Sequence, residues 1–382
     1  MPSSRGRVLV VLLALILLTV CAAGAGYLWL QRLFHSPGPS QSIARIQVEQ
    51  GASVRTVLSE LGNLGALRHP RAIEVYLRLS GRLSGHRLRI QAGMYEIPAA
   101  ASPAQILDLF DQGKVVLEQI TIIEGTTFAD FRRALDHHAA VTHTLLGKSS
   151  AELMAALGHP GEAPEGLFFP DTYRFAARTA DLEILSLAYN AMQRVLGSAW
   201  QQRSVDLPLQ SPYEALTLAS IIEKETGTPE ERARIAGVFV SRLRKGMRLQ
   251  TDPTVIYGLG ASYEGEIRTK DLLKDTPYNT YTRAGLPPTP ICLPGRDSVL
   301  AAVHPQETGE LYFVATGTGD GRHHFSKTLE EHNKAVKSYL EHLRALQRAG
   351  VTHGATGTAP HAETATGSHE PAGPDRTPPG TK

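Results

Sequence analysis

The stretch that decides the fold runs from Ser211 to Thr254 and reads SPYEALTLASIIEKETGTPEERARIAGVFVSRLRKGMRLQTDPT. It opens with Ser211 followed three residues later by Glu214, the spacing of a helix capping box. Pro212 stands at the first helical position, where a missing N–H is tolerated. A helix is therefore expected to begin here.

The same signal returns within the stretch. Gly227 can supply the left-handed residue that ends the first helix, and Thr228 with Glu231 repeats the capping box. The second helix is expected to run to Gly246. Two successive helices followed by a polar turn are thus predicted.

Two glutamates fall on the apolar side of the first helix. At 100° per residue a wide apolar arc contains both Glu223 and Glu225. A carboxylate among aliphatic neighbours loses hydration, which raises its pKa toward the value that a general acid needs near neutral pH. Glu223, between the azimuths of Ala219 and Leu216, is a candidate acid. The alternative, which geometry alone favours, is that either glutamate extends to solvent or pairs with a nearby arginine.

Composition sets wide bounds. A chain of 382 residues, 42% hydrophobic and 20% charged, has room for two or three globular domains. The formal net charge of +2 gives no sign of a polyanionic partner. Cys21 and Cys292 are the two cysteines, so neither a structural disulfide nor a cysteine metal site is expected.

The N-terminus predicts a membrane segment. Residues 1–7 carry Arg5 and Arg7 and are expected in the cytoplasm, and residues 8–30 form an uncharged run long enough to span a bilayer. The alternative is a cleaved signal peptide with Ala23-Gly24-Ala25 as its small-residue site. Either interpretation places the bulk of the chain outside the membrane, where nucleic acid is a poor partner. Residues 31–42 read as an exposed linker.

A small strand-turn-helix pattern then occurs twice. Residues 43–48 predict a strand and 53–61 a helix, and the order returns with a strand at 120–123 and a helix bearing Phe128, Phe131 and Leu135. Between them, 91–97 predict a strand and 103–112 a helix. An internal duplication is indicated, with units at 43–118 and 119–160.

An aromatic segment follows at Glu165 to Phe175, EGLFFPDTYRF. Aromatic faces beside carboxylates and hydroxyls suit sugar rings, so Glu165, Asp171 and Tyr173 are candidate substrate-binding residues. The alternative is a loop whose aromatic side chains fill the core.

The later part of the chain carries polar clusters and a rigid loop. The clusters are Gln250-Thr251-Asp252 and Tyr278-Asn279-Thr280-Tyr281, and the loop is the proline-rich run from Gly285 to Gly295, which is expected to wall a cleft. Strands are predicted at 311–316 and 323–326. Thr328 and Glu331 cap a final helix to about Arg348, and residues 349–382 are expected to be disordered.

The sequence lacks the motifs of several common classes of enzyme. There is no Gly-Lys-Ser/Thr phosphate loop, and Gly260-Ala261-Ser262-Tyr263-Glu264 lacks the second glycine of a nucleophile elbow. The histidines His323, His324 and His332 show no zinc-protease spacing. No metal or cofactor is expected, and carboxylate acid/base chemistry remains.

Several blocks of the chain resemble the endolytic murein transglycosylases, also called YceG-like proteins. The blocks include Pro170-Asp171-Thr172-Tyr173, Ala219 to Thr226 (ASIIEKET), Leu249 to Gly258 (LQTDPTVIYG), Tyr278 to Tyr281 (YNTY), Gly285 to Pro288, Leu311 to Ala315 and Glu331-His332-Asn333. The resemblance covers the chain from the membrane segment to about Arg348.

The resemblance implies an α+β protein with one transmembrane helix, LysM-like sugar-binding units and a lytic domain, at 161–348, with a substrate cleft. It implies an inner-membrane, single-pass protein that lies mainly in the periplasm, cuts glycan strands internally and works beside peptidoglycan synthases. It places the catalytic glutamate at Glu223, the first of the Glu-Lys-Glu-Thr motif. The polar clusters supply the other candidates, which are Gln250, Thr251, Asp252, Tyr278, Asn279, Thr280 and Tyr281.

Other functions stay open from the residues themselves. Glu165, Asp171 or Asp252 could act as a second carboxylate, with water as the nucleophile. A membrane-anchored peptidoglycan-binding scaffold without catalysis, or a metal-dependent peptidase of the same wall, would also fit the location.

Overall fold

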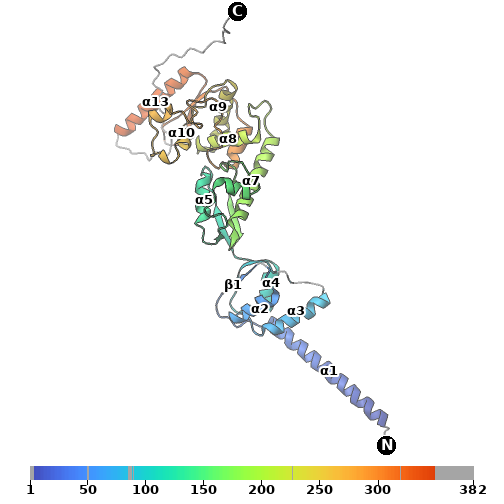
Figure 1. Cartoon of the computed structure of the whole chain (residues 1–382). Helices are drawn as coiled ribbons and strands as arrows, with labels where there is room; N and C mark the ends of the chain where they lie inside the picture. Colours follow the sequence, from blue (N-terminus) through green and yellow to red (C-terminus); the bar gives the residue numbers. More distant parts are fainter. Residues whose placement is uncertain are drawn as a thin grey trace, which may run out of the picture. The chain divides into compact units, whose positions relative to one another are not determined.

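The computed structural model describes residues 4–49, 51–84, 88, 90–225, 227–318 and 320–348. By contacts the chain forms two compact units, Met1–Met192 and Gln193–Lys382. Both combine helices with two-stranded sheets, so the predicted α+β class is confirmed in this coarse form (Figure 1). The predicted disordered tail at 349–382 lies outside the described residues.

Helix α1 spans Ser4–His35, and its segment Leu12–His35 is long and apolar enough to cross a membrane. Length and composition do not separate an anchor from a signal sequence. The helix runs five residues past the predicted span. Beyond it, the Gly38 amide donates to the Ala100 carbonyl (3.0 Å) and the Ala100 amide to Ser40 (2.8 Å). The predicted linker at 31–42 is therefore helical at its start and hydrogen-bonded after it.

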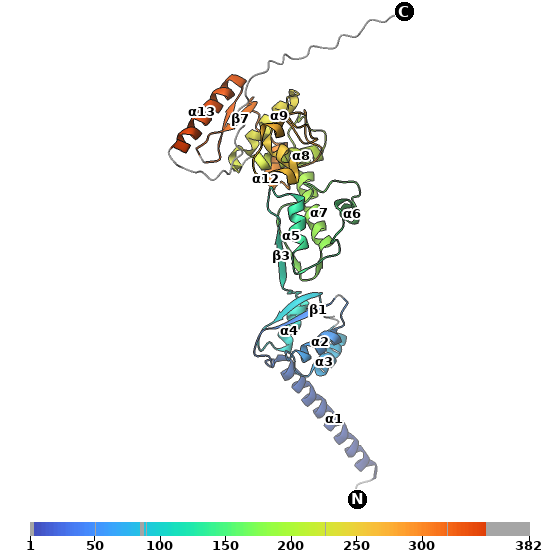
Figure 2. The same cartoon turned by 60° about the vertical axis from the view of Figure 1, so that its left-hand side comes forward.

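The first unit begins with a strand, two helices and a strand (Figure 2). These are β1 (Ala44–Val48), α2 (Val54–Asn63), α3 (Pro70–Ser84) and β2 (Gly93–Ile97), followed by α4 (Pro103–Asp111). Strands β1 and β2 pair antiparallel, with Ile46 opposite Tyr95. Alternate residues of both strands are buried against α2 and α4, which gives this part its own core.

The second half of the first unit again has two helices between paired strands, with a short extra strand between the helices. The elements are β3 (Leu117–Thr121), α5 (Phe128–Asp136), β4 (Val141–Thr142), α6 (Ser150–Ala156), β5 (Thr172–Ala176) and β6 (Thr179–Ala180). Strand β3 pairs antiparallel with β5. This pairing joins residues 172–176 to the first unit, and the unit boundary falls within α7 (Asp181–Gln201), whereas the lytic domain was expected to begin at residue 161.

The second unit is mainly helical. Its elements are α8 (Pro212–Glu225), the 3-10 turn η1 (Pro229–Glu231), α9 (Arg232–Arg244), α10 (Asp252–Leu259), the turn η2 (Gly260–Ser262), α11 (Thr269–Leu273), α12 (Arg296–Val303), β7 (Tyr312–Ala315), β8 (His323–Ser326) and α13 (Leu329–Arg348). Strands β7 and β8 form an antiparallel hairpin, as predicted. Helix α13 packs on that hairpin (Figure 2).

Helix α8 is the centre of this unit, because α9, α10 and α12 all pack against it (Figure 1). Ser211 caps it by accepting from the Glu214 amide (3.2 Å), whereas Glu214 accepts from the Gln210 amide (2.6 Å) and not from that of Ser211. The polar side of α8 is also buried. Ser220 is fully buried, and its hydroxyl accepts from the Ile291 amide (3.0 Å). Both the apolar and the polar side of α8 are therefore packed against other elements of the unit.

The second predicted capping box does not form. The Thr228 hydroxyl donates to the Gly321 carbonyl (3.0 Å), and the Glu231 carboxylate contacts the amide and ring of His323 instead (3.1 and 2.7 Å). A short 3-10 turn therefore precedes α9. The capping box does not form because the side chains of Thr228 and Glu231 bind Gly321 and His323 in the β7–β8 hairpin instead.

Candidate functional site

A pocket of about 170 Å³ lies within the second unit, with walls from α8, α9, α10, β7, β8 and α13. A typical ligand pocket measures about 300–1,000 Å³, so this one suits part of a long ligand. Of the predicted site residues it brings together Gln250, Asp252 and Tyr281. The predicted acid Glu223 is not among the described residues that line it, and Glu225 is.

Glu225 stands at the last turn of α8, partly accessible at the pocket wall. Burial raises its pKa, and the nearby charge of Asp252 raises it further. The Thr251 hydroxyl, which donates to Glu225 Oε1, and the Arg242 guanidinium both act in the opposite direction. The net result is a pKa of about 7. Such a carboxyl can donate a proton and take one back near neutral pH.

Hydrogen bonds from neighbouring residues hold Asp252 and Gln250 in place at the pocket wall. The Tyr281 hydroxyl donates to Asp252 Oδ1 (2.5 Å), and Gln250 has a backbone φ of 51°. A left-handed glutamine is strained and persists only where its surroundings determine it. Here the Thr280 carbonyl accepts from the Gln250 amide (3.2 Å), and Arg242 Nη1 donates to the Gln250 side chain (3.3 Å).

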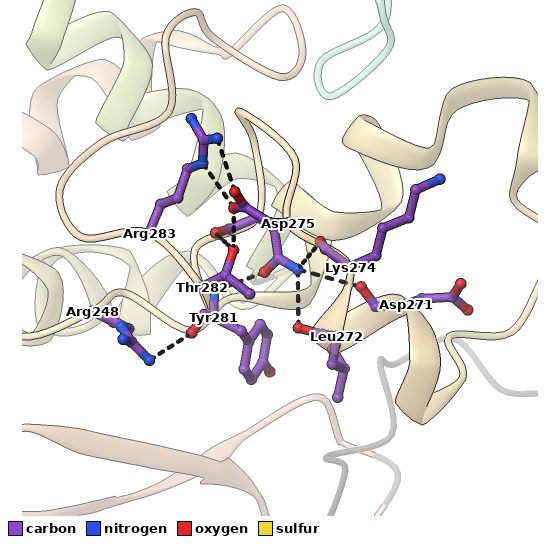
Figure 3. A network of polar contacts seen from close by, with 9 residues as sticks. Arg248, Asp271, Leu272, Lys274, Asp275, Tyr281, Thr282 and Arg283 are labelled. Carbon is purple, nitrogen blue, oxygen red and sulfur yellow. Dashed lines mark hydrogen bonds and ion pairs between the residues drawn. The ribbon is translucent and has the colours of Figure 1, made fainter.

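Asn279 holds the loop that carries Tyr281, and its partners Leu272, Lys274 and Tyr281 lie close together in Figure 3. Its buried side-chain amide donates to the carbonyls of Leu272 (2.9 Å) and Lys274 (2.8 Å), and its Oδ1 accepts from the Tyr281 amide (2.8 Å). Asn279 and Thr280 therefore lie behind the pocket wall. Both residues hold pocket residues in place through hydrogen bonds, and their contact with substrate stays a prediction.

Replacing Asn279 with alanine is expected to lower the unfolding free energy by about 1–2 kcal/mol, because buried hydrogen-bonding groups lose their partners. The matched control is Asp275→Asn on the same loop. Asp275 pairs with Arg283 at the exposed surface (2.8 Å), where ion pairs contribute little. Urea titration of both variants checks this, and equal loss in the two would contradict the positioning role of Asn279.

Tyr278 and Thr251 occupy two further places. Tyr278 packs edge-on against Tyr257, with ring centroids 4.9 Å apart, and its hydroxyl lies 2.9 Å from that of Thr289 in the proline-rich loop. Thr251 is buried, and its amide donates to the Thr280 hydroxyl (3.0 Å). Thr251 thus joins the loop of Thr280 to the carboxylate of Glu225.

Glu223 lies two residues earlier on α8, with its side chain 7% exposed. Its Oε2 accepts from the Gly295 amide (3.0 Å), and its Oε1 lies 3.7 Å from the Arg232 guanidinium. Glu223 therefore joins the proline-rich loop to α8 and α9. For Glu223 the structure thus shows the alternative that the sequence left open, which is pairing with an arginine.

The aromatic segment belongs to the first unit. Glu165 is buried and accepts from the Phe128 amide at the start of α5 (2.9 Å). Asp171 accepts from the Thr172 amide (2.7 Å), and the Tyr173 hydroxyl donates to the Phe169 carbonyl (2.7 Å). Phe168 stacks on Phe128, with centroids 5.1 Å apart. The core-filling alternative thus describes these aromatic side chains.

Arg242, Tyr312 and His332 line the pocket but were not predicted as site residues, although Tyr312 and His332 lie in blocks that carry the resemblance. Arg242 is buried, and its guanidinium donates to the carbonyls of Leu249 (2.9 Å) and Leu311 (2.6 Å). His332 stacks on Tyr312, with ring centroids 5.2 Å apart. For Arg242 the available signal was its position on a strongly apolar helix face, since a buried charge requires partners.

Comparison with protein families matches residues 46–338 to the YceG-like family. A Bacillus subtilis protein named endolytic murein transglycosylase is 32% identical over 325 residues, which is 79% of this chain and 86% of the relative. A Streptococcus pneumoniae (strain D39) protein of the same name is 26% identical over 363 residues, covering 85% of this chain and 64% of the relative.

Among solved structures, a YceG-like protein from Listeria monocytogenes matches with 30% identity. The match covers 77% of this chain and 99% of that protein, with a TM-score of 0.46.

Proposed function

Since the chain belongs to the YceG-like family, we propose that it is an endolytic lytic transglycosylase of peptidoglycan. As a lyase of this kind it cleaves the β-1,4 bond between MurNAc and GlcNAc within glycan strands and leaves 1,6-anhydroMurNAc ends. The observation that supports this chemistry is the Glu225 carboxyl, with a pKa of about 7, in the wall of a pocket that Asp252 also lines.

The reaction needs one group that gives a proton and then accepts one. Protonated Glu225 donates to the glycosidic oxygen as the bond from C1 of MurNAc breaks. The resulting carboxylate removes the proton from the C6 hydroxyl of the same MurNAc, and that oxygen bonds to C1. No water is consumed, because the nucleophile belongs to the substrate. A hydrolase would commonly need a second carboxylate at about 5–9 Å.

The pocket geometry favours Glu225 over Glu223 as this acid. Glu225 faces the space beside Gln250, Asp252 and Tyr281, whereas Glu223 is engaged by Gly295 and Arg232. The sequence-based assignment of Glu223 stays a prediction. Exchanging each glutamate separately for glutamine tests the choice directly.

Asp252 is proposed to help keep Glu225 protonated. Its charge raises the pKa of Glu225, so Asp252→Asn is expected to lower that pKa. Glu225 then loses its proton at a lower pH, and cleavage declines at a lower pH than in the wild type. The rate of glycan cleavage against pH measures this, with the surface variant Asp275→Asn as control. If the cleavage rate of Asp252→Asn declines at the same alkaline pH as that of the wild type, Asp252 does not raise the pKa of Glu225.

The surrounding architecture fits an enzyme of the cell wall. We propose that α1 anchors the chain in the inner membrane by a single pass, with the bulk in the periplasm, and that the two strand-helix-helix-strand regions are LysM-like units that bind glycan. We further propose that cleavage terminates nascent strands beside peptidoglycan synthases.

Incubation of the detergent-solubilised full chain with purified glycan strands tests the function. Internal cleavage that persists with a chelator is expected. Binding without cleavage would instead favour the scaffold, and loss of glycan cleavage with a chelator would favour a metal-dependent glycoside hydrolase.

A further inference from the structure

Helix α1 enters the core of the first unit without a flexible joint. Leu33 and Phe34, in its last turn, pack against the core formed by β1, α2, β2 and α4, and the rings of Phe34 and Tyr76 lie 4.5 Å apart. The hydrogen bonds between residues 38–40 and Ala100 fix the chain after the helix. A bilayer that holds α1 therefore also fixes the depth of this part of the unit.

One contact shows which loop lies at that depth. The ring of Trp29 lies 6.2 Å from that of His69, in the segment that joins α2 to α3. Tryptophan favours the membrane interface, and Trp29 precedes the end of α1 by six residues, or about 9 Å of helix. The segment Leu64–Arg71 is thus held at the level of the lipid headgroups.

This level carries unpaired positive charge. Arg32, Arg68, His69 and Arg71, here called the exit patch, are all exposed. In the described part of the chain no carboxylate lies within ion-pair distance of Arg32, Arg68 or Arg71. Several other exposed arginines of the unit are paired, as Arg45 is with Glu96 (2.7 Å), whereas Arg174 has no carboxylate at ion-pair distance among the described residues. Leu64, 46% exposed, adds an apolar side chain beside the patch.

We propose that the exit patch binds the phosphates of acidic phospholipids in the leaflet from which α1 emerges, with Leu64 seated among the headgroups. Guanidinium groups bind phosphate in a two-pronged geometry, and cations beside a membrane helix attract acidic lipids. Glu74 lines the same pocket as His69 and Arg71, but among the described residues its carboxylate is paired with Arg78 (2.5 Å) and not with an arginine of the patch. The proposal rests on the anchoring role of α1.

Electron paramagnetic resonance of spin-labelled lipids tests this on the full chain in phosphatidylcholine bilayers. The spectrum separates lipid in contact with the protein from bulk lipid, for labelled phosphatidylglycerol and labelled phosphatidylcholine in turn. The wild type is expected to select phosphatidylglycerol. The variant Arg32→Gln/Arg68→Gln/Arg71→Gln is expected to lose about half of that selectivity, because the patch occupies one part of the lipid shell.

The matched control is Arg45→Gln/Arg133→Gln/Arg178→Gln, which removes three exposed but ion-paired arginines of the same unit and is expected to keep the selectivity. Arg5 and Arg7 are present in every variant, so their contribution cancels. The proposal is overturned if the wild type and the patch variant select phosphatidylglycerol equally. It is also overturned if the control variant loses as much of that selectivity as the patch variant. An absence of contact lipid instead refutes the anchor.

Discussion

Glu225→Gln is expected to abolish glycan cleavage, with a loss of at least about a thousandfold in turnover, while the fold is retained. Glutamine has the shape of glutamate and can still accept from Thr251, but it has no proton to donate to the leaving oxygen. Acid/base groups contribute about 10²–10⁴-fold, and here one residue performs both transfers. Release of soluble fragments from purified glycan strands measures the loss.

Glu223→Gln is the matched comparison, one helical half-turn away. The amide oxygen can still accept from Gly295, but the charge opposite Arg232 disappears. Turnover is expected to fall less than about tenfold, since general acid catalysis is untouched, with a small loss of stability. Full loss in Glu223→Gln with near-normal cleavage in Glu225→Gln would reverse the assignment and restore the one suggested by the resemblance.

The second large effect concerns stability. The pKa of Glu225 is about 7 in the native state, whereas its pKa in an unfolded chain is the ordinary value of 4.5. Between these values the native state binds more protons, so its stability falls as pH rises through this window and is level above it. From pH 5 to pH 8 the loss of stability due to this group is about 2–3 kcal/mol.

Glu225→Gln is expected to lack this component, because an amide does not titrate. Other groups contribute equally to both proteins, so the informative quantity is the difference between wild type and variant at each pH. Trp200 lies in the second unit, and in a Trp29→Phe background its fluorescence follows that unit during urea unfolding. A difference that does not change from pH 5 to pH 8 would show that Glu225 has an ordinary pKa in the folded protein.

Local signals in the sequence predicted much of the fold. The final helix has the predicted box, in which the Glu331 amide donates to Thr328 (3.2 Å) and the Thr328 amide to Glu331 (3.3 Å). The hairpin β7–β8 and the core helices followed their hydrophobic periodicity. The box at Thr228 and Glu231 has the same letters but did not form, because its side chains contact Gly321 and His323, far away in sequence.

The same limit applies to the site. Helical periodicity placed Glu223 and Glu225 in one apolar arc and could not say which of them faces a cavity. That depends on Arg232 and Gly295 approaching one flank and on Thr251 and Asp252 lining the other. The polar clusters at 250–252 and 278–281 were found from sequence, yet only the structure separates pocket residues such as Tyr281 from supporting residues such as Asn279.

Mass spectrometry of glycan strands digested by the full chain tests the central claim most directly. Intramolecular attack by the C6 hydroxyl predicts products that end in 1,6-anhydroMurNAc, lighter by one water than hydrolytic products, in amounts equal to the bonds cut. Products with reducing MurNAc ends and no anhydro ends would show that water is the nucleophile and would contradict the single-carboxyl mechanism.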